Sequence, residues 1–109
     1  MTTFDEREKA FEQKYEHDQE LRFKTNARRN KLLGLWAAGL MGKMGDAAES
    51  YAREIVLADL ERPGHHDVVE RLVRDLAAAG KPMEAHTILK QAEQLLIEAR
   101  RQIMTEVKN

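Results

Sequence analysis

The feature that most constrains the fold is a helical periodicity that recurs in every segment between the turn signals of the chain. Apolar residues return at spacings of three and four, most clearly from Glu84 to Glu106. No stretch alternates apolar and polar residues as a half-buried strand would. Ala, Leu, Glu, Lys, Arg, Gln and Met, which are strong helix formers, supply most of the chain. The pattern therefore predicts an all-α protein.

Glycine-containing turns divide this pattern into four segments. The turns read GLMGKMGD, ERPGHHD and AAGKP, and the last two contain Pro63 and Pro82. We expect helices over about 21–41, 46–61, 66–79 and 84–106. Because short connections join antiparallel neighbours, residues 21–109 are predicted to form a small four-helix bundle.

The segment 21–41 is predicted to bury its largest apolar residues. These are Phe23, Ala27, Leu32, Leu35, Trp36 and Leu40. The opposite, solvent-exposed face is predicted to consist of Arg22, Lys24, Arg28 and Lys31. Gly34 and Gly39 each cost roughly 1 kcal/mol relative to Ala in a helix interior, which predicts a close helix crossing at both positions. Asp46 and Asp67 are expected to cap the next two helices, and Gly80 to terminate the second of them.

The composition argues against several kinds of partner. The chain has 109 residues, no cysteine and a net charge of -1, so it offers no disulfide, no thiolate metal site and no field that attracts nucleic acid. The longest apolar run, Leu32 to Met41, is too short to span a bilayer, and no signal peptide is present. We expect a cytoplasmic protein, monomeric when isolated, that binds no nucleic acid and does not insert into a membrane.

No catalytic signature is found. The spacing from Gly34 to Gly39 resembles the start of a phosphate-binding loop, but Leu40 and Met41 occupy the positions that require Lys and Ser or Thr. The adjacent pair His65 and His66 would point about 100° apart on a helix and could not chelate one ion together. The sequence therefore predicts a non-enzyme without metal or cofactor.

Residues 1–20 differ from the rest of the chain because almost all of them are charged or polar. Three aromatic residues nevertheless form one ridge on a helix, because Phe11 and Tyr15 each fall within about 20° of Phe4. Burying them would yield roughly 5 to 9 kcal/mol, whereas ordering about twenty residues costs on the order of 20 kcal/mol. We expect residues 1 to about 18 to be mobile or partly helical in the free protein and to become a helix in a partner's groove. The alternative is that the ridge packs on the bundle.

The two flanks of this aromatic ridge carry opposite charges. Four carboxylates follow one another at four-residue spacing on one side, at Glu8, Glu12, Glu16 and Glu20, and Arg7 and Lys14 lie on the other side. Like charges at this spacing weaken an isolated helix by a few tenths of a kcal/mol per pair. The segment is therefore predicted to favour a helix when its acidic column is protonated or faces a basic surface.

Three runs of the chain are especially characteristic, FDEREKAFE, HDQELRFK and ARRNKLLGLWAA. They resemble one known family, the zeta subunit of the F-type ATP synthase of alphaproteobacteria. Later runs, AESYAREIV, ERPGHHDV, RDLAAAGK and LLIEARRQI, look like the helices and turns of the same family, so the resemblance covers essentially the whole chain. Two loops depart from it: the segment around Arg62 to His66 is less acidic, and GLMGKMGD is more basic and richer in methionine.

The resemblance implies a non-catalytic inhibitor of ATP hydrolysis. In that family, an N-terminal segment inserts as a helix at a catalytic interface between the alpha and beta subunits and touches the gamma subunit, which blocks rotation. Carried over to this chain, residues 1–20 are the inhibitory arm, and such a protein would associate peripherally with the inner membrane through the synthase. Its implied partner contacts are Phe4, Arg7, Glu8, Lys9, Phe11, Lys14 and Tyr15.

A different interpretation stays open from the residues alone. Arg28, Arg29 and Lys31 form a local basic cluster. A small helical adaptor or nucleotide-binding regulatory module could use this cluster for an acidic ligand.

Acidification is predicted to raise the helicity of a peptide that spans residues 1–24. Protonating the column from Glu8 to Glu20 removes the repulsion between successive carboxylates, so the helical signal should rise as pH falls from 7 towards about 4. Circular dichroism measures the change. If the signal stays constant on acidification, the column does not control the helix, and inhibition should not strengthen at low pH for this reason.

Overall fold

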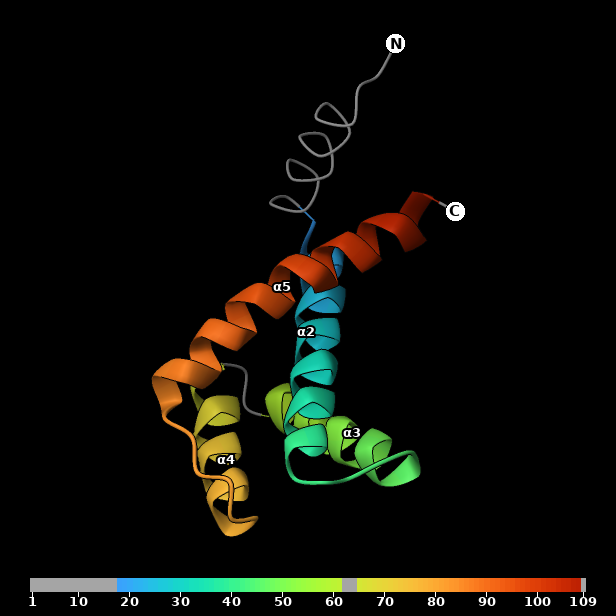
Figure 1. The fold of residues 1–109 in the computed structure, drawn as a ribbon. Coiled ribbons are helices and arrows are strands. Elements are labelled where there is room, and N and C mark those ends of the chain that lie inside the picture. Colours follow the sequence, from blue (N-terminus) through green and yellow to red (C-terminus); the bar gives the residue numbers. More distant parts are fainter. Residues whose placement is uncertain (1–17, 62–64, 109) are drawn as a thin grey trace.

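The computed structural model describes residues 18–61 and 65–108, and these residues form four helices without a strand (Figure 1). The helices are α2 (Gln19–Leu40), α3 (Asp46–Glu61), α4 (His65–Ala78) and α5 (Ala85–Lys108). The predicted all-α fold is thereby confirmed. Helix α2 begins two residues before the expected start at 21, and α5 extends two residues beyond the expected end at 106.

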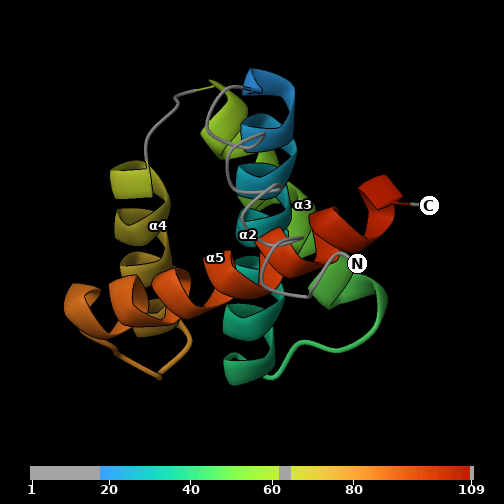
Figure 2. The ribbon, with the colours of Figure 1, turned by 90° about the horizontal axis from the view of Figure 1, so that it is seen from above.

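Helix α2 is the centre of the fold. It packs mainly against α3 and α5, and α4 lies against α3 and α5. In Figures 1 and 2, α5 crosses α2 obliquely and reaches α4 with its first half. The helices are therefore less regularly antiparallel than short connections alone suggest, because α5 bridges α4 and the start of α2.

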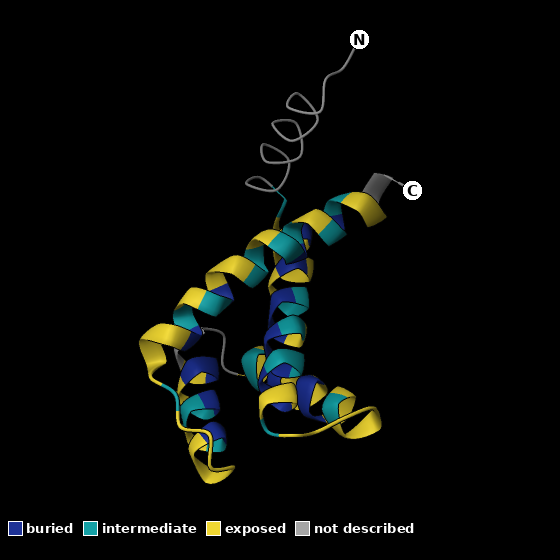
Figure 3. Ribbon diagram, in the orientation of Figure 1, coloured by how far each residue is buried: buried dark blue, intermediate teal, exposed yellow. Residues whose placement is uncertain are grey.

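The main core lies where α2, α3, α4 and the first half of α5 meet (Figure 3). Its buried residues are Leu33, Ala37, Ala38, Tyr51, Ile55, Val68, Val69, Leu72, Leu76, Ile88 and Ala92. A second, smaller cluster joins the first turns of α2 to the last turns of α5, through Leu21, Ile103 and Met104. The chain thus holds α2 near both of its ends.

The buried face of α2 is not the one that its apolar residues predict. Phe23 and Leu40 are 56% and 37% exposed, whereas Thr25 and Asn30 are buried. The reason is that α3 and α5 cover α2 from two directions, so burial follows the two contacts rather than the apolar stripe. The Thr25 hydroxyl is satisfied within the helix, because it donates a hydrogen bond to the Leu21 carbonyl at 2.7 Å.

The close helix crossing is found at Gly34 but not at Gly39. A Cβ atom at Gly34 would lie 2.8 Å from the Ala52 Cα atom and 3.3 Å from Ile55. The prediction for Gly39 is wrong, since a Cβ atom there meets nothing within 4 Å. Gly34 is therefore the position at which the backbones of α2 and α3 approach.

The helix ends show one expected cap and two corrections. Gly80 has a φ of 77°, its N–H donates to the Ala77 carbonyl, and the Lys81 N–H donates to the Leu76 carbonyl. This is a Schellman motif, and it confirms Gly80 as the end of α4. Asp46 lies inside the first turn of α3 instead of capping it, because the Glu49 N–H donates to the Gly45 carbonyl. Asp67 likewise lies inside the first turn of α4, which begins at His65.

We predict opposite effects for alanine at the two α2 glycines. Gly34→Ala should lower the free energy of unfolding by about 1 to 3 kcal/mol, because the new methyl group meets backbone that cannot move independently. Gly39→Ala should be neutral or stabilise by up to about 1 kcal/mol, because helical Ala loses less backbone entropy than Gly. Urea unfolding followed by circular dichroism gives both values. Equal effects of the two substitutions would contradict the proposed approach of α2 to α3.

Candidate functional site

The helical bundle begins with a capped helix start at Asp18. This residue has extended backbone angles, φ -110° and ψ 102°, and its Oδ1 atom accepts hydrogen bonds from the N–H groups of Glu20 and Leu21 at 3.0 and 3.2 Å. The carboxylate thus satisfies two of the open N–H groups of α2. An Asp before a run of helix formers is the sequence signal for this cap, and the predicted helix start at 21 missed it.

The predicted partner contacts precede this cap. Phe4, Arg7, Glu8, Lys9, Phe11, Lys14 and Tyr15 all lie outside the described residues. What the structure does place is the bundle surface beside the point where they attach.

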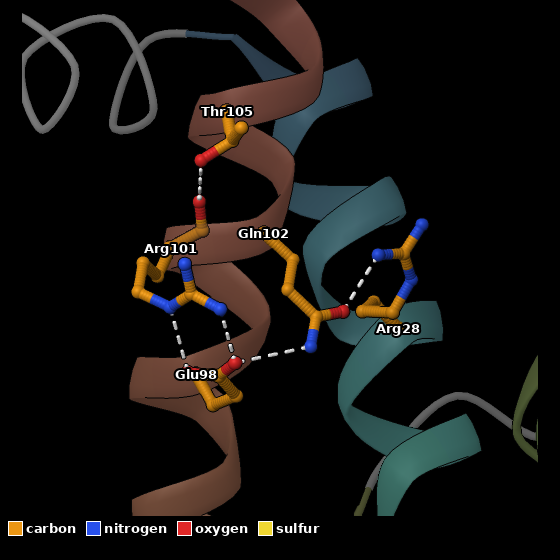
Figure 4. Close-up of polar contacts among 5 residues, drawn as sticks. All are labelled: Arg28, Glu98, Arg101, Gln102 and Thr105. Atoms are coloured by element: carbon orange, nitrogen blue, oxygen red, sulfur yellow. Dashed lines mark hydrogen bonds and ion pairs between the residues drawn. The ribbon is translucent and has the colours of Figure 1, made fainter.

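A polar clasp fixes the first half of α2 on α5 (Figure 4). The half-buried Arg28 side chain donates from Nη1 to Gln102 Oε1 and from Nη2 to Glu106 Oε1, each at 2.7 Å. The Gln102 amide in turn donates to Glu98 Oε1 at 3.2 Å. Together with the Leu21 cluster, this clasp fixes Asp18 on the bundle. We call Asp18, where the N-terminal segment joins the bundle, the root of that segment.

Glu98 continues the same chain of contacts along α5. Arg101 donates to both of its carboxylate oxygens, at 2.6 and 2.9 Å. The hydrogen bonds from Arg101 and then from Gln102 lower the pKa of Glu98 to about 2. Glu98 therefore stays ionised throughout the physiological pH range.

An open groove runs along α2 between α3 and α5, next to the root. Its volume is about 420 Å³. The apolar part is formed by Phe23, Ala27, Val56 and Ile103, and the cationic rim by Lys24, Arg28 and Lys31, with Glu106 beside Arg28. We call this the Phe23 groove.

More apolar surface is exposed on α3. Leu57 is 51% and Leu60 45% exposed, and Leu60 lines a smaller hollow that Phe23 also lines. An aromatic residue that was expected in the core thus lines two hollows of the surface.

The basic cluster predicted from the sequence does not form one surface. Arg29 is only 9% exposed, and its Nε and Nη2 atoms donate to Asn30 Oδ1 at 3.2 and 3.1 Å. Arg28 is engaged in the clasp, whereas Lys31 is exposed. Because adjacent residues of a helix point about 100° apart, Arg28 and Arg29 cannot serve the same ligand face.

A second polar cluster, which the sequence did not reveal, joins α3 to α4. The Tyr51 hydroxyl donates to Asp75 Oδ2 at 2.6 Å, and Arg71 Nε donates to the same oxygen at 3.3 Å. The Arg71 guanidinium also lies 5.8 Å from the centre of the Tyr51 ring. Burial, and then the hydrogen bond to Asp75, raise the pKa of Tyr51. The three residues come from separate turns of two helices, so no spacing in the sequence marks them.

The described residues give no metal site and no membrane-crossing helix. In 18–61 and 65–108, no three His, Asp or Glu side chains gather closely enough to bind an ion. None of the helices in these ranges combines the length and apolar character that a bilayer requires.

Comparison with known proteins decides the family. The protein-family model for ATPase inhibitor subunit zeta matches residues 1–102. The chain belongs to this family. A protein structure solved in solution by NMR is 42% identical, with a TM-score of 0.69, and the match covers 79% of this chain and 98% of that one. No curated protein matches the chain.

The zeta family match includes the segment that the structure does not describe. Residues 1–17 fall within the matched range, together with the Asp18 cap and the whole of α2, α3 and α4. The family match therefore includes both the N-terminal segment and most of the bundle, and an inhibitor subunit fits the non-catalytic character expected from the sequence.

Tyr51 is predicted to make the stability of this zeta-family protein fall at alkaline pH. Its folded pKa lies above the ordinary value of 10.0, so the unfolded chain loses the phenol proton first. The stability from this group is complete below about pH 10 and declines as pH rises further. Tyr51→Phe should flatten that decline, and Tyr15→Phe serves as the control for loss of a phenol. Urea unfolding at a series of alkaline pH values measures it, and parallel curves for wild type and Tyr51→Phe would contradict the assignment.

Proposed function

We propose that this zeta-family protein inhibits ATP hydrolysis by the F-type ATP synthase, with residues 1–20 as the inhibitory arm. The arm inserts as a helix at a catalytic interface between the alpha and beta subunits, next to the gamma subunit, and blocks rotation. The observation that supports this proposal most directly is the family match over residues 1–102, because it includes the arm and the bundle.

The arm has the residues that a segment inserted between two subunits needs. In the inserted helix, Phe4, Phe11 and Tyr15 supply one apolar ridge, and the polar contacts flank it, at Arg7, Glu8, Lys9 and Lys14. Such a segment needs no catalytic group. It only has to bind one conformational state of the motor better than the others, since differential affinity shifts the equilibrium between states.

The bundle contributes a rigid point of attachment. The Asp18 cap fixes the start of α2, and Arg28 holds the following turns on α5. A fixed root reduces the conformational freedom that the arm loses on insertion, and therefore the cost of binding. The bundle in this proposal docks and orients the arm and does not itself enter the catalytic interface.

The proposal also assigns a location and a set of partners. The protein acts in the cytoplasm, associated with the inner membrane only through the catalytic head of the synthase. Its partners are the alpha, beta and gamma subunits, and the mechanism needs no cofactor, nucleic acid or insertion into the bilayer.

Removal of the arm is predicted to abolish inhibition without unfolding the bundle. ATP hydrolysis by the matching catalytic head should fall when the full-length chain is added and should be unaffected by a chain that begins at Asp18, which retains the α2 cap. Phe11→Ala should weaken inhibition by at least about tenfold, because a buried aromatic anchor contributes more than about 1.4 kcal/mol.

The matched control is Leu57→Ala, which removes an exposed apolar side chain from the bundle and leaves the arm intact. Circular dichroism verifies that each variant is folded. Equal hydrolysis rates with and without the full-length chain would refute the proposed function.

A further inference from the structure

The Phe23 groove and the N-terminal arm have complementary surfaces. The groove presents apolar side chains beside the cationic rim of Lys24, Arg28 and Lys31. The arm presents an aromatic ridge beside a column of carboxylates. An occupant of this groove must be apolar on one side and acidic on the next, and residues 1–17 of the same chain have this pattern.

Lys31 is the residue of the cationic rim whose charge is not paired within the described residues. Lys24 pairs with Glu20 at 3.3 Å, and Arg28 is bound to Gln102 and Glu106. Lys31 is exposed and has no hydrogen-bond or ion-pair partner within residues 18–61 and 65–108. An acidic side chain that entered the groove would therefore meet an uncompensated cation at Lys31.

The tether has the right length and position. The arm joins the bundle at Asp18, one and a half turns before Phe23, and only Glu16 and His17 separate Tyr15 from that cap. The extended backbone of Asp18 interrupts the helical path, so the arm need not continue the axis of α2. A reversal here would run the arm back along α2.

The spacing of the aromatic residues along the arm then matches the spacing of the groove residues along α2. Helices rise about 1.5 Å per residue, so a Tyr15 level with Phe23 sets Phe11 level with Ala27 and brings Glu8 level with Asn30, one residue before Lys31. The ridge covers the apolar part of the groove in this register, and the acidic column follows its cationic rim.

We propose that, in the free protein, the N-terminal arm docks into the Phe23 groove of its own bundle and must leave it before it can bind elsewhere. The regulatory part of this inference rests on the proposed function, because the groove and the catalytic head then compete for the same aromatic ridge. A docked arm lowers the apparent affinity for the head in proportion to the fraction of molecules in which the arm is released.

Paramagnetic relaxation measured on the full-length chain tests the docking. Since the chain contains no cysteine, Ala10→Cys provides a unique site for a spin label without altering the ridge. The label should broaden the amide signals of Phe23, Lys31 and Val56 and leave those of Arg74, on the exposed side of α4, unchanged. Signals of equal intensity with oxidised and reduced label throughout the groove would overturn the proposal.

Charge reversal at the rim supplies the specific test. Lys31→Glu should abolish the broadening, and the double change Lys31→Glu with Glu8→Lys should restore it. Lys81→Glu makes the same charge change in an exposed turn and should have no effect. Loss of broadening with Lys81→Glu as well, or no restoration in the double variant, would contradict the predicted register.

Mixing distinguishes the chain's own arm from another occupant. A spin-labelled chain without isotope, added to an isotope-labelled chain without spin label, should cause no broadening. Broadening in this mixture would show that a second copy occupies the groove and would overturn the intramolecular proposal.

Inhibition assays separate this inference from the proposed function. If docking and inhibition both occur, Lys31→Glu should lower the concentration needed for half-inhibition by about threefold to tenfold, and Lys81→Glu should not. Docking without any inhibition by the wild-type chain would refute the proposed function and leave the docking intact. Inhibition with equal potency of wild type and Lys31→Glu would refute the competition.

Discussion

The backbone of α2 approaches that of α3 at Gly34, and the rest of the bundle depends on this contact. Ala52 occupies the position where a side chain at Gly34 would lie, and the neighbouring Ile55 is completely buried. A residue with a Cβ atom would separate the two helices and open the core between them. Because α3 covers this side of α2 so closely, another side remains for α5, whose contacts fix the first turns of α2.

Apolar and polar contacts have different roles in this small domain. The apolar core supplies a stabilisation that depends on buried area and has little direction. Direction comes from the polar links at its edges, where Tyr51 joins α3 to Asp75 of α4 and Arg28 joins α2 to the last turns of α5. Hydrogen bonds to charged groups have stricter geometry than apolar contacts, so these links set how the helices are oriented. The oblique crossing of α5 over α2 lies beside the Arg28 link.

The same crossing connects the fold with the proposed inhibition. It lies beside the Asp18 cap, to which the proposed inhibitory arm is attached, and it leaves Phe23 exposed in a groove next to that cap. In the docking proposed above, the Phe23 groove and the partner's surface compete for the same aromatic ridge of the arm. Such competition would regulate inhibition, because each site lowers the occupancy of the other.

The periodic pattern and the glycine turns by themselves determined the helical class of this chain. They also indicated the Gly80 cap and the crossing at Gly34, although Gly39 carries the same signal inside α2 and makes no crossing. Local geometry is enough for such features, since neighbours in the sequence are neighbours in the helix.

Only the tertiary structure decided which side of α2 is buried. Phe23 and Leu40 are exposed and Asn30 is buried because α3 and α5 approach from directions that the pattern of one helix does not contain. For the same reason, Arg29 is buried and does not share a surface with Arg28. Tyr51 likewise binds Asp75, which lies 24 residues away in the sequence. The aromatic ridge of the arm was recognisable in the sequence, whereas the groove that complements it exists only where three helices meet.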